Sequence, residues 1–204
     1  SVPVINALSD LEHPCQALAD YLTLRERFAD SNNDLSNVCL AYVGDGNNVA
    51  HSLLLTAACS GSSIRIATPT GYEPSAEIVA TAREIAHETG ARIHLTNDPH
   101  EAVAGADAVY TDAWVSMGQE EETQKREKIF PPYQVNAELM AEAAPHAVFM
   151  HCLPAHRGLE VTDEVMDSEQ SLIFEQAENR LHVQKAILYL LLGGDRRPTR
   201  SAHA

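Results

Sequence analysis

Five short runs of mostly apolar residues alternate with helix-like segments along this 204-residue chain. Consecutive apolar residues, rather than an alternating pattern, are typical of strands that are covered on both faces. Strands that alternate with helices predict a parallel sheet. We therefore expect an α/β fold, a doubly wound, Rossmann-like parallel sheet of about five strands with helices on both faces. The expected strands lie at 38–43, 64–67, 92–95, 108–111 and 147–150.

The helices are predicted from their periodicity and from the signals at their ends. Apolar residues recur at every third or fourth position after Pro14, so we expect a helix from Pro14 to Phe28. Gly90 stands where a helix commonly ends in a left-handed residue. Between the fourth and fifth strands, residues 114–128 are polar, and a connection of this length is usually functional or disordered. Further helices are expected from the turn at 44–48 to 59, from 73–75 to 88, after 98–99 and over 175–192.

The composition excludes several classes of partner. The chain has 14 basic and 29 acidic residues and a formal net charge of −15, which argues against nucleic acid or an anionic membrane. It contains no run of 18 apolar residues, and its first residues have neither the charged nor the apolar region of a signal peptide. The 4 cysteines are scattered, so we expect free thiols in a reducing compartment, the cytoplasm, and no metal site.

The segment from His151 to Gly158 follows the last expected strand and contains a cysteine, two histidines and an arginine. Ligands of open parallel sheets bind where the strands end. Pro154 stiffens the turn that follows Cys152. A single cysteine in such a turn is usually an ordinary buried thiol, so its interpretation depends on the other motifs.

Two other strand ends carry polar residues. After the first strand, Gly44 and Gly46 match part of a dinucleotide-binding fingerprint, but the third glycine is missing and no acidic residue closes the next strand. We interpret this segment as a tight turn that presents Asn47 or Asn48 to a ligand, while the other asparagine caps the following helix. Asp112 ends the fourth strand and can pair with an ammonium group, although alone it would be read as a solvated turn carboxylate.

Near the N-terminus, His13 and Gln16 flank the start of the first expected helix, with Pro14 at its first position. Their spacing lets both side chains converge on one carbonyl oxygen beside a helix N-terminus, where negative charge is favoured. The simpler interpretation is helix capping. Arg180, near the start of the last expected helix, is by itself most simply a surface residue.

Taken together, these motifs resemble the aspartate/ornithine carbamoyltransferase family, and within it the ornithine branch. Ser-Met-Gly combined with His-Cys-Leu-Pro is specific for that branch. The resemblance implies transfer of a carbamoyl group from carbamoyl phosphate to the δ-amine of L-ornithine, giving L-citrulline and phosphate in arginine biosynthesis, with no cofactor. The matching segments occur in the family's order: His13–Gln16, Gly44–Asn48, Ser116–Gly118, His151–Pro154 and Asn179–Arg180.

The resemblance also implies a role for each site residue. Asp112 and Cys152 would be the catalytic residues, and Cys152 would position the amine as a thiol or thiolate rather than act as a covalent nucleophile. His13 and Gln16 would polarise the carbamoyl carbonyl. The residues implied for carbamoyl phosphate are His13, Gln16, Cys152, Leu153 and Arg180, and those implied for ornithine are Asn48, Asp112, Ser116 and Met117.

The chain departs from the family at the phosphate-binding loop. The family carries a Ser-Thr-Arg-Thr loop in an N-terminal domain, whereas the only Thr-Arg pair here is Thr199-Arg200. We therefore expect an inactive ornithine-binding fragment of an enzyme that is homotrimeric at full length, and no stable trimer of the fragment. Its expected parts are an interdomain helix region (1–28), the ornithine-binding domain (29–174), a C-terminal helix returning to the missing domain (175–192) and a flexible tail (193–204).

Two alternatives stay open. The chain could belong to another transcarbamoylase that uses putrescine or an acylated ornithine, or it could be a non-catalytic amino-acid-binding module. In the truncated-enzyme interpretation, the first and last helices would pack partly against the missing domain and leave an apolar surface. The residues expected on this surface are Leu18, Tyr21, Leu22, Ile187, Leu188, Leu190 and Leu191.

Overall fold

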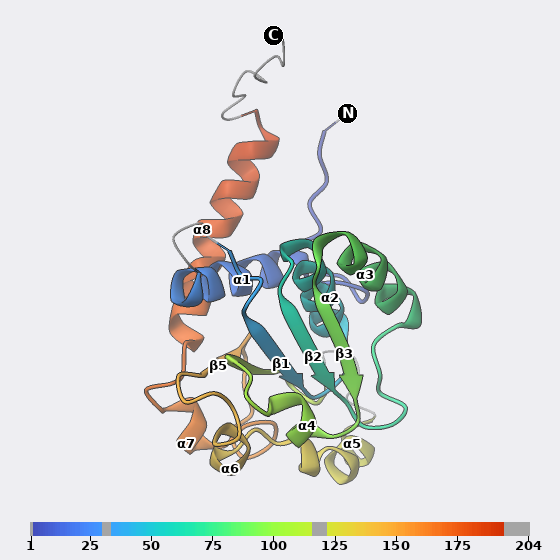
Figure 1. Cartoon of the computed structure of the whole chain (residues 1–204), viewed down its shortest axis with the longest axis vertical. Coiled ribbons are helices and arrows are strands. Elements are labelled where there is room, and N and C mark those ends of the chain that lie inside the picture. The colour runs from blue at the N-terminus through green and yellow to red at the C-terminus, as the bar shows by residue number, and fades with distance from the viewer. Residues whose placement is uncertain (1, 30–33, 116–121, 194–204) are drawn as a thin grey trace.

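The computed structural model describes residues 2–29, 34–115 and 122–193. Its described part contains a five-stranded parallel sheet with the strand order β3-β2-β1-β4-β5 (Figure 1). The first three strands add in one direction, and the chain then crosses back to place β4 on the other side of β1. This is the doubly wound arrangement expected from the sequence. The strands are β1 (Cys39–Val43), β2 (Ser63–Ala67), β3 (Arg92–Thr96), β4 (Ala108–Thr111) and β5 (Val148–His151).

Helices cover both faces of the sheet. Successive side chains of a strand point to opposite faces, so Leu40 and Tyr42 belong to one buried layer and Ala41 and Val43 to the other. The first layer packs against α1 (Pro14–Phe28), α2 (Asn48–Ser60) and α3 (Ala76–Thr89). The second packs against α4 (Pro99–Val103), α6 (Ala137–Met140) and α7 (Asp163–Met166).

The last helix, α8 (Ile173–Leu191), packs against α1 and then extends beyond the rest of the domain (Figure 1). Its final turns carry the exposed side chains of Leu188, Leu190 and Leu191, as expected. On α1, Leu18 is also exposed, but Tyr21 is not. The expectation for Tyr21 is wrong, because its ring packs in the core of this domain and its hydroxyl lies 3.1 Å from that of Ser62.

The long polar connection between β4 and β5 contains helices that the sequence did not predict. Its second half forms α5 (Thr123–Ile129), followed by the 3-10 turn η2 (Pro131–Tyr133). These elements, like α6 and α7, are too short to show an apolar period, so the interpretation of 114–128 as a loop is wrong over α5. The other elements lie within a few residues of their expected bounds.

Cys15, Cys39, Cys59 and Cys152 are all free thiols. No helix in the described ranges is long and apolar enough to cross a membrane.

Candidate functional site

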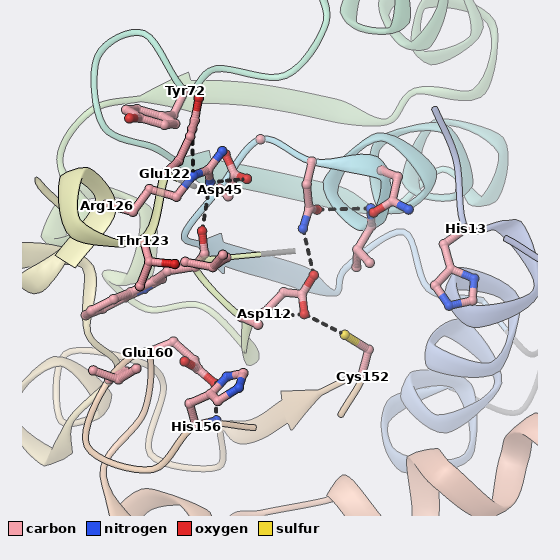
Figure 2. A pocket seen from close by; sticks show the side chains of 18 of the residues that line it. His13, Asp45, Tyr72, Asp112, Glu122, Thr123, Arg126, Cys152, His156 and Glu160 are labelled. Atoms are coloured by element: carbon pink, nitrogen blue, oxygen red, sulfur yellow. Dashed lines mark hydrogen bonds and ion pairs between the residues drawn. The ribbon is translucent and has the colours of Figure 1, made fainter. Parts of the chain in front are cut away.

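A cavity of about 1430 Å³ lies where β1, β4 and β5 end (Figure 2). The strand order reverses between β1 and β4, and ligands of doubly wound sheets bind beside such a reversal. Asp45 follows β1, Asp112 follows β4 and Cys152 follows β5, and all three line the cavity. Residues far apart in the sequence therefore meet at one edge of the sheet.

Asp112 is the centre of a hydrogen-bonded group in this cavity (Figure 2). Its Oδ2 accepts a hydrogen bond from Nδ2 of Asn47 at 2.7 Å. Its Oδ1 accepts from the thiol of Cys152 at 3.0 Å and from the backbone N–H of Ala113 at 2.7 Å. These contacts fix the carboxylate at the C-terminal end of β4, where it can bind a cation.

Cys152 is a neutral thiol in this arrangement. Burial raises the pKa of Cys152 well above its usual value, and the neighbouring charge of Asp112 raises it further. A thiolate beside the carboxylate would also lose the S–H donor of the bond between them. The sequence left the protonation state open, and the structure favours the thiol.

The turn after β1 holds Asn47 in place. A Cβ atom on Gly46 would lie 2.3 Å from the backbone nitrogen of Pro74, so only glycine fits against this neighbouring loop. Asn47 Oδ1 accepts from the N–H groups of Val49 at 3.0 Å and Ala50 at 3.2 Å, which caps α2. Asn47 is therefore both the expected cap and the residue that orients Asp112.

Asn48 and His13 lie on the side of the cavity nearest the N-terminal segment. Asn48 lines the cavity and donates from Nδ2 to the carbonyl of Ser9 at 2.8 Å. His13 precedes the first turn of α1 and lines the same cavity. Burial and the charge of Arg180 lower the pKa of His13, so its imidazole is neutral at neutral pH. Its Nδ1 is buried and has no hydrogen-bond partner among the described residues.

Gln16 and Arg180 bond to one another and are not among the residues that line the cavity. Arg180 donates from its guanidinium to Oε1 of Gln16, and Gln16 donates from Nε2 to Asp20 at 2.7 Å. The amide oxygen of Gln16 therefore faces Arg180. An oxygen is an acceptor, so in this orientation Gln16 does not present a donor that would polarise a carbonyl.

A buried ion pair forms the opposite wall of the cavity (Figure 2). Arg126 of α5 donates to Oδ2 of Asp45 at 2.6 Å and to the carbonyl of Trp114 at 2.7 Å. Burial raises the pKa of Asp45, and the hydrogen bond and charge of Arg126 oppose that rise. The guanidinium also lies 4.9 Å from the ring centroid of Tyr72. This pair ties α5 to the turn after β1.

His151 is the last residue of β5 and is fully buried, and it is not among the residues that line the cavity. Its Nδ1 accepts from the N–H of Leu153 at 2.8 Å, which assigns the ring proton to Nε2. Nε2 lies 3.4 Å from Oε1 of Glu160. Burial alone would raise the pKa of Glu160. The interactions with His151 and with the N–H of His156 outweigh the effect of burial and hold the pKa of Glu160 below its usual value.

Arg157 does not contribute to the cavity. Its guanidinium donates hydrogen bonds to Asp163 and Asp167 instead.

Among the described residues, one group could hold a metal ion: Asp112, His151 and Cys152. One potential ligand atom from each lies within 4.8 Å of the others. A carboxylate, an imidazole and a thiol suit zinc and other transition metals. Because the three residues come from two strand ends, no local spacing could have predicted this group. In the structure as described, the thiol proton and Asp112 form a hydrogen bond instead.

The structure brings together five of the nine predicted site residues in one cavity. Gln16 and Arg180 form a separate pair beside it, and Ser116 and Met117 lie outside the described residues. The residues that line the cavity are His13, Asn48, Asp112, Cys152 and Leu153.

Sequence reasoning missed four residues in or beside the site. Asp45 lies in a turn of the partial fingerprint, Arg126 and Glu160 lie in segments without recognised motifs, and Asp20 lies in the middle of α1. Asp20 had a usable signal, since an acidic residue one turn after Gln16 sits between Ala19 and Tyr21 on a buried helix face. A buried carboxyl needs partners.

A sequence model of one family covers most of the chain. The Asp/Orn binding domain of aspartate/ornithine carbamoyltransferase matches residues 36–191. The chain belongs to this family. The carbamoyl-P binding domain of the same carbamoyltransferase family matches residues 1–26.

Carbamoyltransferases named for ornithine are similar over nearly the whole chain. The chain is 54% identical over 194 residues to the ornithine carbamoyltransferase of Thermococcus kodakarensis, covering 95% of this chain and 60% of that protein. It is 58% identical over 193 residues to that of Methanothermobacter thermautotrophicus, covering 95% and 62%. The solved structure from Pyrococcus furiosus has a TM-score of 0.89 at 53% identity, covering 96% of this chain and 61% of that one. The chain thus spans about 60% of the length of these relatives.

Proposed function

We propose that this chain is the ornithine-binding part of an ornithine carbamoyltransferase, acting in arginine biosynthesis. The observation that carries the proposal is the position of Asp112, fixed between Asn47 and Cys152 at the reversal point of the sheet. A buried carboxylate there suits a substrate with an ammonium group. Its relatives' names supply the acceptor, ornithine.

The reaction joins the δ-amine of ornithine to the carbamoyl carbon of carbamoyl phosphate. The uncharged amine attacks that carbon to form the new C–N bond, and the carbonyl oxygen gains negative charge. The C–O bond to phosphate then breaks, and the attacking nitrogen loses one proton, which the departing phosphate can take up. Asp112 holds the amino acid, and Cys152, as a neutral thiol, orients the carboxylate and the amine. A donor placed at the developing oxyanion stabilises the transition state. His13, which lines the cavity with a neutral ring, is the candidate for that donor.

The remaining roles divide between the two substrates. Gln16 offers an amide oxygen, which suits the carbamoyl –NH2 group rather than its carbonyl oxygen. Arg180, beside it, can donate to the carbonyl oxygen of the same carbamoyl moiety. Leu153 follows Cys152 with a left-handed backbone (φ +59°), and such a conformation in a non-glycine residue is typical of ligand sites. Asn48, Ser116 and Met117 are proposed to bind the α-amino and α-carboxyl groups of ornithine.

The proposal extends to the whole protein. The Ser-Thr-Arg-Thr sequence to which the resemblance assigns phosphate binding does not occur in these 204 residues, so we propose that the chain alone is inactive. We place the enzyme in the cytoplasm, without a cofactor, and as a homotrimer at full length. The parts 1–28, 29–174, 175–192 and 193–204 remain our division of the chain. The exposed Leu188, Leu190 and Leu191 suit a helix that packs against a further domain.

Citrulline synthesis tests the proposal. We expect no measurable citrulline from the 204-residue chain, and turnover once it is combined with the carbamoyl-phosphate-binding part of the Pyrococcus furiosus enzyme. Each part assayed alone is the control. Robust turnover by the 204 residues alone would refute the proposal that activity needs a separate carbamoyl-phosphate-binding part. A sedimentation measurement accompanies it: a tight trimer of the isolated chain would contradict the expected assembly.

A further inference from the structure

Asp20 is a fully buried acidic residue in the middle of α1, and none of the roles proposed above uses it. Its Oδ1 accepts hydrogen bonds from Nε2 of Gln16 and Nε2 of Gln176, both at 2.7 Å. Its Oδ2 accepts from the hydroxyl of Tyr110 at 3.0 Å. One carboxyl group therefore joins donors from α1, α8 and β4. Burying it is costly, so its presence calls for a role that an apolar side chain could not fill.

The carboxyl of Asp20 decides which way the Gln16 amide points. A side-chain amide has two orientations that exchange its oxygen and its nitrogen. Oδ1 of Asp20 accepts, so the nitrogen of Gln16 must face it. Arg180 can only donate, so the oxygen must face Arg180. Asp20 and Arg180 thus select the same orientation from opposite ends of the amide.

Gln176 depends less on Asp20 than Gln16 does. Its Nε2 also lies 3.2 Å from the hydroxyl of Tyr110, and its Oε1 accepts from the N–H of His151 at 3.0 Å. Loss of the Asp20 carboxyl leaves Gln176 with both of these partners. Gln16 would keep only Arg180, so the effect of the loss should fall on Gln16.

We propose that Asp20 is a positioning residue, which holds the Gln16 amide with its oxygen toward Arg180 and so prepares the pair that receives the carbamoyl group. This inference rests on the proposed function, because Gln16 and Arg180 are assigned to the carbamoyl group there. Asp20 itself is out of reach of the cavity and touches no reacting atom.

Three variants separate positioning from packing. Asp20→Leu keeps the branched shape at Cγ, with a larger volume, and removes the acceptor. Asp20→Asn restores an acceptor oxygen at the same place, and its nitrogen can donate to Tyr110. Thr23→Val is the matched control: Thr23 is equally buried on α1 and also bonds to α8, where Asn179 donates to its hydroxyl at 3.0 Å.

The first readout is the side-chain amide signal of Gln16 in nuclear magnetic resonance spectra of the 204-residue chain, assigned with Gln16→Met. We expect the signal to be the same in the unsubstituted chain, Asp20→Asn and Thr23→Val, and to move and exchange faster with solvent in Asp20→Leu. An unchanged signal in Asp20→Leu would overturn the inference. If Asp20→Leu does not fold, Asp20→Asn provides the test. The inference would be overturned if the Gln16 amide signal of Asp20→Asn were displaced to its position in the unfolded chain.

The second readout is kinetic and uses a chimera in which these 204 residues replace the matching part of the Pyrococcus furiosus enzyme. We expect Asp20→Leu to raise the KM for carbamoyl phosphate by about tenfold, equivalent to 1.4 kcal/mol, and to change the ornithine KM by less than about threefold. Asp20→Asn should restore the KM for carbamoyl phosphate, and Thr23→Val should leave it unchanged.

The two proposals fail in different ways. A chimera without citrulline synthesis, beside an active Pyrococcus furiosus enzyme, would contradict the proposed function. An active chimera in which Asp20→Leu and Asp20→Asn behave alike would contradict the positioning role alone. Equal losses in Asp20→Leu and Thr23→Val would show a packing effect and would also overturn it.

Discussion

The thiol of Cys152 donates a hydrogen bond to the carboxylate of Asp112, with Sγ 3.0 Å from Oδ1. Burial and that carboxylate together raise the pKa of Cys152 well above its usual value. A reactive cysteine needs a lowered pKa and positive surroundings, and Cys152 has the opposite. The bond therefore supports the proposed role of Cys152, which is to orient Asp112 and the substrate amine, over covalent catalysis.

Alkylation rates test this protonation state. In the 204-residue chain at pH 7.5, Cys152 should react with iodoacetamide much more slowly than the exposed Cys59, which serves as the internal control. Asp112→Asn should accelerate Cys152, because the neighbouring negative charge is removed. Mass spectrometry of digested samples measures each rate. Faster reaction at Cys152 than at Cys59 would contradict a neutral, half-buried thiol.

Asp112→Asn should weaken the use of ornithine in the active chimera. The substrate ammonium loses its counter-charge, which typically costs about 2–3 kcal/mol in a buried site. Initial rates at varied ornithine and varied carbamoyl phosphate separate the two substrates, and Glu142→Gln, which changes an exposed partner of His100, is the control. If ornithine kinetics stayed the same while carbamoyl phosphate binding collapsed, the assignment of Asp112 would be wrong.

The buried pair of Asp45 and Arg126 should stabilise the chain through α5. Arg126→Leu leaves the carboxylate of Asp45 buried without its partner, and such a change costs about 3–5 kcal/mol. Asp45→Asn combined with Arg126→Leu should recover a large part of that loss, because no charge is left uncompensated. Urea unfolding of the two single variants and the double variant forms the test. Purely additive effects would show that the two residues are not coupled.

Asp20 should make stability depend on pH. Burial raises its pKa to about 7, although three hydrogen bonds and the charge of Arg180 oppose the rise. The pKa of Asp20 is near 3.8 in the unfolded chain and higher in the folded one. Its contribution to stability is therefore fully present at a pH below the unfolded pKa, and it is lost as the pH rises through the folded pKa. The free energy of unfolding should therefore fall from pH 4 to above pH 7 by up to about 4 kcal/mol.

The same unfolding series on Asp20→Asn isolates this effect from other titrating groups. The variant should lose less stability than the unsubstituted chain over that range, so the two curves should converge or cross as the pH rises. Parallel curves would show that Asp20 does not titrate between these limits.

The parts of the site at strand ends could be predicted, because parallel strands that end in polar residues bring them to one edge. Asp112 and Cys152 follow this rule and meet as expected. The roles of Asn47 and Asn48 could not be separated, because capping and ligand binding ask for the same side chain. The expected exposure of Tyr21 is wrong because the apolar face of an amphipathic helix does not indicate which domain packs against that face. The pairing of Asp45 with Arg126 spans 81 residues and leaves no local pattern.

The acceptor substrate is the central claim, and citrulline formation by the chimera measures it most directly. With carbamoyl phosphate as donor, we compare kcat/KM for L-ornithine, putrescine and an acylated ornithine. Because a site built to hydrogen-bond a substrate group strongly rejects analogues that lack it, ornithine should be preferred by about a hundredfold or more. Equal or better use of putrescine or the acylated ornithine would contradict the account.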